Sequence, residues 1–377
     1  MSGRDRGRYY LLIINFINIF EKIAILGPGA QYDTCGPKDF GNTTKIPGVY
    51  YAKTSNGGIC KLFKVLQSNV CQNNCNYCAY RRDRDTRRVT TTADEMASAF
   101  NTVWNSRKVD GLFLSSGIVK NPTFSMSQLI DTATILRNKY KYNGYIHLKI
   151  MPGTEESAIE EAIRISNRIS LNVESPTSDS LAIVAPDKTW DKDFKATLDR
   201  IDKIFQKRKY MELRNPSLTT QLVVGAGGEQ DREIIDVVGN LYKEYNFKRI
   251  FYSTFRPVDK TPLQDHHPTS LIREHRLYQA DFLITQYGFT AEEIPTNMFG
   301  FLDEGIDPKK VWADLHPKVF PININTAPYQ QLIRVPGLGP ISAKKIIKFR
   351  KIKRIVDKFD MEKTRIQWNK ALNYLSF

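Results

Sequence analysis

Residues 61–78 read Lys-Leu-Phe-Lys-Val-Leu-Gln-Ser-Asn-Val-Cys-Gln-Asn-Asn-Cys-Asn-Tyr-Cys, and this stretch sets how the rest of the chain is interpreted. Its first part, residues 61–68, has the length and apolar content of a β-strand. Its second part places Cys71, Cys75 and Cys78 in a loop in which Tyr77 supplies the one apolar side chain. We therefore predict a strand that leads directly into a loop of thiols.

Three thiols at this spacing indicate a metal centre, because thiolates are soft ligands that suit iron–sulfur clusters, zinc and copper(I). A fully ligated [4Fe–4S] cluster takes four cysteines, and no histidine precedes His147 in the chain. The simplest interpretation is a [4Fe–4S] cluster with three irons held by the protein and one open iron. A structural zinc site is the alternative, with Cys35 or Cys60 as its fourth ligand.

The remaining composition argues against a secreted or membrane protein. Five cysteines in 377 residues are not a disulfide framework. Residues 9–26 are the one candidate membrane segment, but four polar or charged side chains interrupt it, and no clear cleavage site follows. The apolar spacing there fits an amphipathic helix that packs on the main domain, with contacts from Leu12, Phe16, Ile19, Ile23 and Leu26. We expect a cytoplasmic location and no membrane partner.

Strand-like and helix-like segments alternate after the cysteine loop. The expected strands are 111–115, 145–150, 168–174, 219–224 and 249–255. The expected helices are 91–106, capped by Thr91 or Thr92, 125–140, capped by Ser125, 154–167, one from 178, 191–207 and 231–245. Six strands separated by helices imply parallel pairing through right-handed crossovers. The predicted fold class is α/β, a partial (β/α)6 TIM-like barrel whose ligands gather at the carboxyl ends of the strands.

Polar residues near those strand ends are the candidate site. Small residues that let a ligand approach the backbone follow the second strand, namely Ser115, Ser116 and Gly117. The third and fourth strands place polar side chains on one face each, His147 with Lys149 and Asn172 with Glu174. Polar side chains inside a barrel are costly without a partner. We therefore expect either a bound ligand or an internal lysine–glutamate pair.

The last two strands and the arginine-rich loop add candidates. Val224 and Gly225 end the fifth strand, where glycine permits close backbone approach, although the GxGxxG spacing is absent. The sixth strand carries Tyr252 and Ser253, with Arg256 after it to neutralise an anion or form a structural salt bridge. Five arginines in residues 81–88 suggest phosphate contacts, and a solvated charged loop is the alternative.

The tail of the chain is basic and helical. A formal charge of +15 favours an anionic partner, and residues 317–377 hold 13 Lys and Arg against 3 Asp and Glu. One strong helix is expected over 271–287, followed by a linker with Pro295 and Pro308. A helix then starts at Pro328, breaks at residues 332–340, and a second helix runs over 341–350.

The break in this helical hairpin resembles the turn of a helix-hairpin-helix motif, through Pro336, Gly337, Leu338 and Gly339. Glycine N–H groups at a helix N-terminus are a ready phosphate site. Lysines on the second helix add affinity for DNA without reading bases, here Lys344, Lys345 and Lys348. The alternative is a plain helical hairpin used for packing.

The cysteine triplet, with an aromatic residue just before its third cysteine, resembles the cluster motif of the radical S-adenosylmethionine (SAM) superfamily. Together with the hairpin it resembles radical SAM proteins assigned to DNA modification or repair. The likeness extends to Tyr32-Asp33, Cys35, residues 224–226 and residues 273–280. The resemblance implies a [4Fe–4S] cluster on Cys71, Cys75 and Cys78, SAM as cofactor and an external electron donor such as a ferredoxin or flavodoxin.

The same resemblance implies which residues contact SAM: Tyr77, Ser115, Ser116, Gly117, Lys149, Asn172, Glu174, Val224 and Gly225. The family often has Gly-Gly-Glu after the second strand, where this chain has Ser115-Ser116-Gly117. Cys35 or Tyr252 would act as a hydrogen-atom relay.

The sequence therefore predicts four segments: an N-terminal helix and loop (1–60), the barrel (61–265), a helical connector (266–316) and an all-α DNA-binding domain (317–377). The predicted activity is reductive cleavage of SAM to a 5′-deoxyadenosyl radical that attacks a nucleotide of DNA. Two alternatives stay open, an RNA-modifying enzyme of the same class and a nucleic-acid-binding protein with a structural iron–sulfur or zinc site.

Overall fold

A computed structural model describes residues 19–33, 46–53, 58–362 and 364–377. Its contacts group the chain into two compact units. The first is Met1–Gly228 with Tyr245–Thr269, and the second is Glu229–Glu244 with Ser270–Phe377. Residues 266–269 of the expected connector fall in the first unit, and the rest of it falls with the tail. None of the helices in the described residues is long and apolar enough to cross a membrane.

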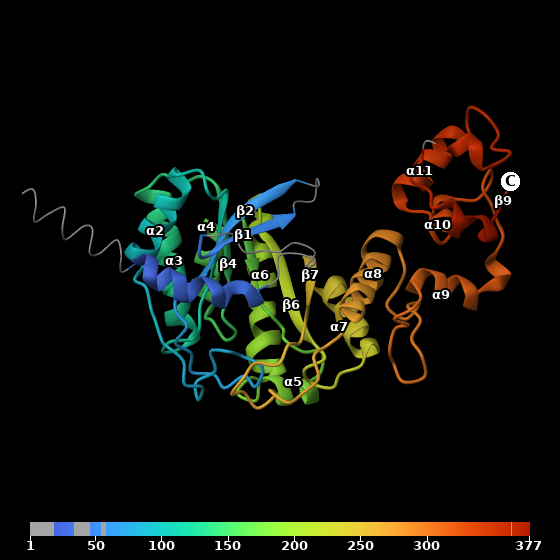
Figure 1. The fold of residues 1–377 in the computed structure, drawn as a ribbon. Helices are drawn as coiled ribbons and strands as arrows, with labels where there is room; N and C mark the ends of the chain where they lie inside the picture. The colour runs from blue at the N-terminus through green and yellow to red at the C-terminus, as the bar shows by residue number, and fades with distance from the viewer. Residues whose placement is uncertain (1–18, 34–45, 54–57, 363) are drawn as a thin grey trace, which may run out of the picture. The chain divides into compact units, whose positions relative to one another are not determined.

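The first unit is built on one seven-stranded sheet whose strands follow the order of the sequence (Figure 1). β1 (Val49–Lys53) pairs antiparallel with β2 (Ile59–Leu66). All later neighbours pair in parallel: β3 (Gly111–Ser115), β4 (Tyr145–Lys149), β5 (Arg168–Ser170), β6 (Ser217–Val224) and β7 (Phe247–Thr254). In the described residues β7 does not pair with β1, so the barrel is open. The predicted partial barrel is confirmed, with β1 as an antiparallel edge strand that the sequence analysis missed.

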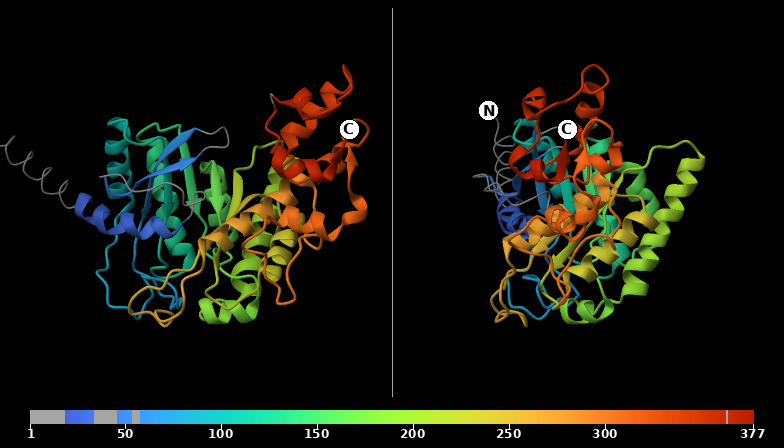
Figure 2. Two further views of the ribbon diagram at one scale, coloured as in Figure 1. Left: turned by 45° about the vertical axis from the view of Figure 1, so that its right-hand side comes forward. Right: turned by 90° about the vertical axis from the view of Figure 1, so that its right-hand side faces the viewer.

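Helices connect the parallel strands and pack on one another in chain order. α2 (Ala93–Asn105), α3 (Pro122–Asn138), α4 (Glu156–Ile165) and α6 (Ala196–Tyr210) each contact the next along the chain. Right-handed crossovers between strands taken in order place such helices on one face of the sheet, an arrangement that can be followed in the views of Figure 2. The other face is left for ligands.

The helix starts show where side-chain chemistry confirmed or changed the predicted boundaries. Thr92 caps α2 in a capping box with Glu95, as one of the two expected caps. α3 begins earlier than predicted, because Asn121 accepts the Phe124 N–H at 2.7 Å and caps the helix with Pro122 in its first turn. Ser125 is therefore not a cap; its hydroxyl oxygen accepts the Val119 N–H instead.

The fourth predicted strand, 168–174, is shorter than expected. β5 ends at Ser170, and the chain beyond it pairs irregularly with β6. The Val173 N–H goes to the hydroxyl of Thr220 at 3.1 Å, and Glu174 has a φ of +63°. A left-handed residue interrupts the regular strand geometry. The backbone of Glu174 nevertheless forms a bridge with Leu222 of β6, because its N–H donates to the Gln221 carbonyl oxygen at 3.2 Å and its own carbonyl oxygen accepts the Val223 N–H at 2.8 Å.

An N-terminal helix over residues 19–29 supports the edge of the sheet. Its apolar residues Ile19, Ile23 and Leu26 are buried, as the amphipathic spacing predicts. Tyr50 of β1 donates its hydroxyl proton to the carbonyl oxygen of Gly27 at 2.9 Å. Leu12 and Phe16, which were predicted to share this face, lie outside the described residues.

The second unit is mostly helical. It contains α7 (Asp231–Glu244), α8 (Leu271–Tyr287), α9 (Pro308–Leu315), α10 (Tyr329–Leu332), α11 (Pro340–Phe349) and α12 (Trp368–Ala371), with a small parallel pair, β8 (Ile322–Asn323) and β9 (Leu375–Ser376). α8 has the predicted bounds. α9 lies where the sequence predicted a linker with Pro308. This proline is instead the first residue of a helix capped by Asp307.

Candidate functional site

The first unit contains a cavity of about 560 Å³, a volume in the range of small-molecule sites. Tyr50 of β1, Lys64 of β2 and Ser253 of β7 all line it, so the sheet curls around it. Three thiols belong to the same wall: Cys71, Cys75 and Cys78. The structure therefore brings the cysteine loop and the strand ends to one cavity.

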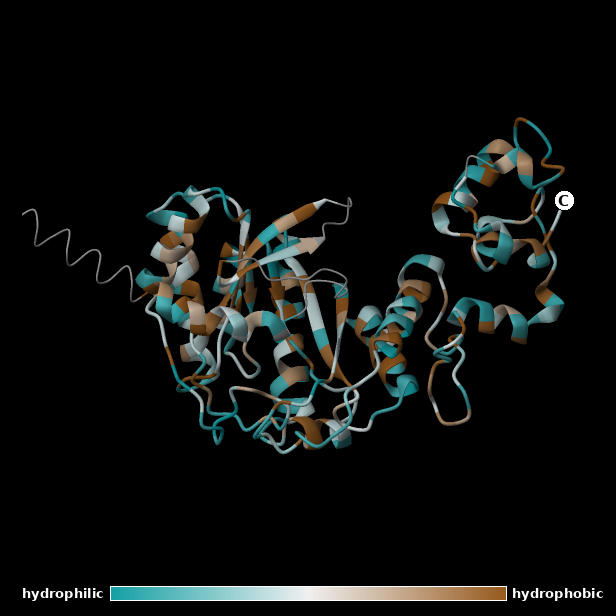
Figure 3. Ribbon diagram, in the orientation of Figure 1, coloured by the Kyte–Doolittle hydropathy of each residue, from teal (hydrophilic) through white to brown (hydrophobic). Residues whose placement is uncertain are grey.

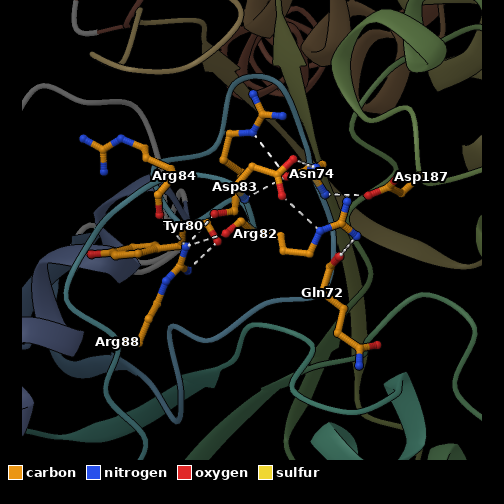
Figure 4. Close-up of polar contacts among 9 residues, drawn as sticks. Gln72, Asn74, Tyr80, Arg82, Asp83, Arg84, Arg88 and Asp187 are labelled. Atoms are coloured by element: carbon orange, nitrogen blue, oxygen red, sulfur yellow. Dashed lines mark hydrogen bonds and ion pairs between the residues drawn. The ribbon is translucent and has the colours of Figure 1, made fainter.

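Side chains outside the loop hold the cysteine loop in place (Figure 4). The carboxylate of Asp187 accepts the Asn74 N–H at 2.6 Å. The side chain of Asn74 donates to Asp83, and Arg82 donates to the carbonyl oxygen of Gln72 at 3.0 Å. The loop is therefore fixed by side-chain contacts, one of them from Asp187, which is 113 residues away along the chain, and not by regular secondary structure.

The arginine-rich loop acts as a clamp on the backbone around the cysteines. Arg88 donates to four carbonyl oxygens at 2.5–2.9 Å, those of Asn69, Tyr80, Arg81 and Arg84 (Figure 4). Arg84 in turn donates to the carbonyl oxygens of Ala79 and Asp259, both at 2.9 Å. The side chains of Arg84 and Arg88 therefore stabilise the fold through backbone contacts, whereas Arg87 is exposed to solvent. The solvated-loop and phosphate interpretations both overlooked this structural role.

Burial makes two thiols of the loop, Cys75 and Cys78, poor acids in the absence of a metal. It raises the pKa of Cys75 to about 12, with Lys188 opposing that rise, and the pKa of Cys78 to about 11. Metal binding replaces the proton on each thiol. No group of three or more His, Cys, Asp or Glu side chains in the described residues is arranged around a single-ion position. Three thiols on one cavity wall, with open space beside them, fit a multi-iron cluster in ligand type and access.

A buried ion pair adjoins the thiols. Glu174 accepts a hydrogen bond from the Tyr77 hydroxyl at 2.9 Å and one from the Lys188 ammonium at 3.1 Å. Burial opposes the charge on Lys188, but Cys75 and Glu174 outweigh it and raise the pKa of that lysine. Burial and the nearby Glu174 raise the pKa of Tyr77 well above its usual value. The cavity thus holds a fixed lysine–carboxylate–phenol group next to Cys75.

A second ion pair lies elsewhere on the cavity wall. Lys149 donates to the Asp33 carboxylate at 2.6 Å, and Lys64 donates to the Asp33 carbonyl oxygen at 2.7 Å. The alternative of an internal Lys149–Glu174 pair is therefore wrong. Lys149 pairs with Asp33, and Glu174 pairs with Lys188. The alternation of side chains along a strand could not predict these ion-pair partners, since Asp33 and Lys188 come from segments outside the sheet.

Two lining lysines were missed by the sequence analysis. Lys64 lies in β2 and is 5% exposed. Its position between the apolar residues Phe63 and Val65 could have indicated a buried lysine. Lys188 lies between α5 (Ser178–Val184) and α6, in a stretch whose sequence carries no recognisable motif.

The predicted SAM-contact residues divide into two groups. Tyr77, Lys149, Asn172 and Glu174 line the cavity together with Ser115, Ser116 and Gly117. Val224 and Gly225 do not line it. Gly225 has a φ of +87°, and a Cβ there would lie 2.0 Å from the Thr269 hydroxyl oxygen, so this glycine serves a tight turn.

The remaining candidates differ in whether they line the cavity. Tyr252 is 2% exposed within β7 and is not among the lining residues, whereas its neighbour Ser253 is. His147 is buried, stacked on Phe113 with ring centres 4.0 Å apart, and its pKa is held well below the usual value by burial and nearby cations. Arg256 is exposed and lines the cavity. Cys35 lies outside the described residues.

The hairpin of the second unit joins α10 to α11. Gly337 has a φ of +76°, and a Cβ on it would lie 2.6 Å from the carbonyl oxygen of Gln367. Gly339 caps α11, and Pro336 and Leu338 are buried. Three lysines are exposed along α11: Lys344, Lys345 and Lys348. The predicted hairpin geometry is present, with its glycines in the turn and its cations on the surface.

Two comparisons with known proteins gave matches to parts of this chain. The family model of the helix-hairpin-helix motif matches residues 319–361. No curated protein matches the chain. Solved structures with a similar fold include methylornithine synthase PylB (13% identity, TM-score 0.47, 58% of this chain and 60% of that one).

Two further structures with a similar fold are also distant in sequence. The maturase HydG from Carboxydothermus hydrogenoformans has 16% identity and a TM-score of 0.47 over 58% of this chain and 50% of that one. Coproporphyrinogen III oxidase HemN from Escherichia coli, described as a radical SAM enzyme, has 16% identity and a TM-score of 0.40 over 57% and 50%. This chain therefore spans about half the length of the structures it matches.

Proposed function

We propose that the chain is a radical SAM enzyme that acts on DNA. The observation that carries the proposal is the convergence of Cys71, Cys75 and Cys78, at their characteristic spacing, on one cavity of a partial barrel. These thiols would hold a [4Fe–4S] cluster. The bound cluster would deliver an electron to SAM, whose reductive cleavage gives a 5′-deoxyadenosyl radical. An external donor such as a ferredoxin or flavodoxin would supply that electron.

The chain's own residues bind and orient SAM in this proposal. The Glu174 carboxylate would accept from the amino group or ribose of SAM, since its position is fixed by Tyr77 and Lys188. Asn172, Ser115 and Ser116 add hydrogen-bonding groups on the same wall. Because these groups come from different strand ends, they can contact several parts of one ligand at once. Tyr252 is buried away from the cavity and has no part in the proposal.

The charge on the cavity wall favours an anionic substrate. Its lining includes four cationic side chains, those of Lys64, Lys149, Lys188 and Arg256, against the two carboxylates of Asp33 and Glu174. Each carboxylate is already bonded to a lysine, so an excess of positive charge remains for a ligand. A nucleotide phosphate matches that excess, and the helix-hairpin-helix motif of the second unit supports DNA as its source.

The test is anaerobic reconstitution with iron and sulfide, followed by SAM and a reductant. The wild-type protein is expected to release 5′-deoxyadenosine, and Cys75→Ala is expected to lose both the bound iron and this product. Cys60→Ala is the matched control, because Cys60 is a described cysteine in β2 that does not line the cavity. If 5′-deoxyadenosine is absent, or forms equally in Cys75→Ala, the chain is not a radical SAM enzyme.

DNA and RNA substrates are distinguished by the 2′-hydroxyl. Mass spectrometry of nucleosides from cells with and without the protein is expected to show a changed deoxynucleoside. A changed ribonucleoside, or turnover that requires a 2′-hydroxyl, would replace DNA by RNA in this proposal.

A further inference from the structure

The segment after α11 presents large apolar side chains to solvent within the most basic part of the chain. Residues 351–359 read Lys-Ile-Lys-Arg-Ile-Val-Asp-Lys-Phe. Ile352, Val356 and Phe359 are 84%, 61% and 66% exposed, whereas Ile355 and Met361 are buried in the core of the unit. Of these five apolar residues, two therefore pack in the core and three are exposed to solvent.

The backbone that carries Phe359 is fixed by two carboxylates. Asp357 accepts the N–H groups of Phe359 at 2.8 Å and of Asp360 at 3.3 Å. Asp360 accepts from the Val356 N–H at 2.9 Å and from the Lys353 ammonium at 2.8 Å. Because the aromatic ring projects from an ordered turn, little conformational entropy is lost when a ligand contacts it.

Cations are frequent in the sequence on both sides of Phe359. Residues 341–361 contain eight Lys and Arg against two Asp, and the Lys358 ammonium lies 5.2 Å from the centre of the Phe359 ring. Seven of those cations are exposed: Lys344, Lys345, Lys348, Lys351, Lys353, Arg354 and Lys358. Figure 3 shows hydrophilic and hydrophobic stretches alternating along the loop that follows α11.

An exposed aromatic ring in a basic segment is more than the binding of duplex DNA alone requires. Contacts to the phosphates of paired DNA need cations and backbone N–H groups, and no exposed aromatic side chain. A basic surface that also carries an exposed aromatic ring has the composition of sites for unpaired strands, in which bases stack on the ring. The charge of the surroundings disfavours a second copy of the same basic segment as the occupant.

We propose that Phe359 stacks on an unpaired base of DNA while the neighbouring lysines and Arg354 contact the flanking phosphates. This inference rests on the proposed action on DNA, and it narrows the ligand to DNA with an unpaired nucleotide. The binding surface thereby selects DNA in which a base is already out of the stack, the state that chemistry on a base requires.

The test compares two DNAs of the same sequence, a fully paired duplex and one with a single looped-out base, by fluorescence anisotropy at fixed salt with the full chain. Phe359→Ala is expected to lose roughly 5- to 100-fold in affinity for the looped DNA and to bind the duplex almost unchanged. Phe359→Trp is expected to retain the preference. The matched control is Leu315→Ala, since Leu315 is 65% exposed in the same unit.

A fluorescent adenine analogue at the looped position gives a second readout, because stacking quenches it. Quenching by the wild-type and Phe359→Trp proteins, and not by Phe359→Ala, supports the proposal. Equal affinity of the wild-type protein for both DNAs overturns it and leaves the proposed function standing. Self-association of the wild-type protein that Phe359→Ala abolishes also overturns it. Failure to bind either DNA instead removes the proposed function.

Discussion

Each of the two units buries a lysine, and the pKa values of the two lysines shift in opposite directions. Lys188, on the cavity of the first unit, donates to the carboxylate of Glu174 at 3.1 Å, and its pKa is raised although burial opposes its charge. Lys309, in α9 of the second unit, donates to the carbonyl oxygen of Leu338 at 2.6 Å and lies 4.5 Å from the ring centre of Tyr287. Burial lowers the pKa of Lys309 to about 7, and nearby Asp307 only partly offsets this.

The difference shows how each unit uses charge. In the first unit, a paired carboxylate stabilises the buried ammonium of Lys188 on the cavity wall. In the second unit, the buried Lys309 donates to a backbone carbonyl oxygen, and exposed lysines lie on α11 and on the segment after it. The pKa values of the two buried lysines thus differ with the acceptor, a carboxylate for Lys188 and a carbonyl oxygen for Lys309.

Replacing Lys188 should have the largest effect on stability. Lys188→Met leaves Glu174 buried without its cation, and breaking a buried pair costs about 3–5 kcal/mol. The measurement is urea unfolding of the metal-free protein, with hydrogen exchange to assign the loss to the first unit. Lys192→Met, at an exposed position nearby, is the control and should change stability by less than about 0.5 kcal/mol. Equal effects of both variants would show that the pair does not support the cavity.

Removing the arginine clamp should come second. Arg88→Met leaves four carbonyl oxygens without their donor, and we expect a loss of about 2–3 kcal/mol, since an unmade hydrogen bond in a part-buried site is costly. The neighbouring Arg87→Met is the matched control, because Arg87 is exposed. Hydrogen exchange in residues 71–88 should rise in the first variant and not in the second. A similar rise in both would mean that the loop is held by charge alone.

The third prediction concerns the turn of the helical hairpin in the second unit. Gly337→Val places a β-branched residue at a φ of +76° and against the Gln367 carbonyl oxygen, which should cost about 1–3 kcal/mol and weaken DNA binding. Gly339→Ala should be milder, because the φ of Gly339 is −106° and its Cβ would meet the Tyr287 hydroxyl at 3.3 Å. Thermal unfolding and DNA affinity measure both. Equal losses would refute the conformational argument for Gly337.

The last prediction concerns Lys309, whose effect on stability appears only as the pH changes. Its folded pKa of about 7 lies below the ordinary value of 10.5, so between these values the unfolded chain binds a proton that the folded chain does not. Stability from this group therefore rises with pH above about pH 7, by up to about 1.4 kcal/mol per pH unit. The difference in unfolding free energy between the wild-type protein and Lys309→Met should follow this slope up to about pH 9. A flat difference would mean that Lys309 stays charged when buried.

The order of strands and helices could be predicted because it depends on local patterns. The bounds of β3 and α8 follow directly from an apolar run and from a capped, periodic segment. The glycines of the hairpin could be predicted equally well, since the turn that contains them is formed by residues close together in the sequence. Errors arose where one residue type occurs in two structural settings, as when Pro308 starts α9 instead of lying in a linker.

The site was predictable only in part. The cysteine spacing and the strand ends pointed to Cys71, Ser115 and Asn172, which the cavity brings together. The partners of the buried charges could not be predicted, because Asp33 and Lys188 reach Lys149 and Glu174 across many residues of chain. The burial of Tyr252 was equally hidden, since alternation along a strand does not say how deep a side chain lies.

The sequence by itself determined a thiol-rich loop after a strand, an alternating α/β core and a basic hairpin, because ligand spacing, periodicity and turn chemistry are properties of neighbouring residues. The tertiary structure alone decided which charges are paired, which arginines clamp the backbone and which apolar residues of the tail stay exposed. Those outcomes depend on the curl of the sheet and on packing between distant segments. The curl gathers the strand ends around one cavity and so converts separate motifs into one site.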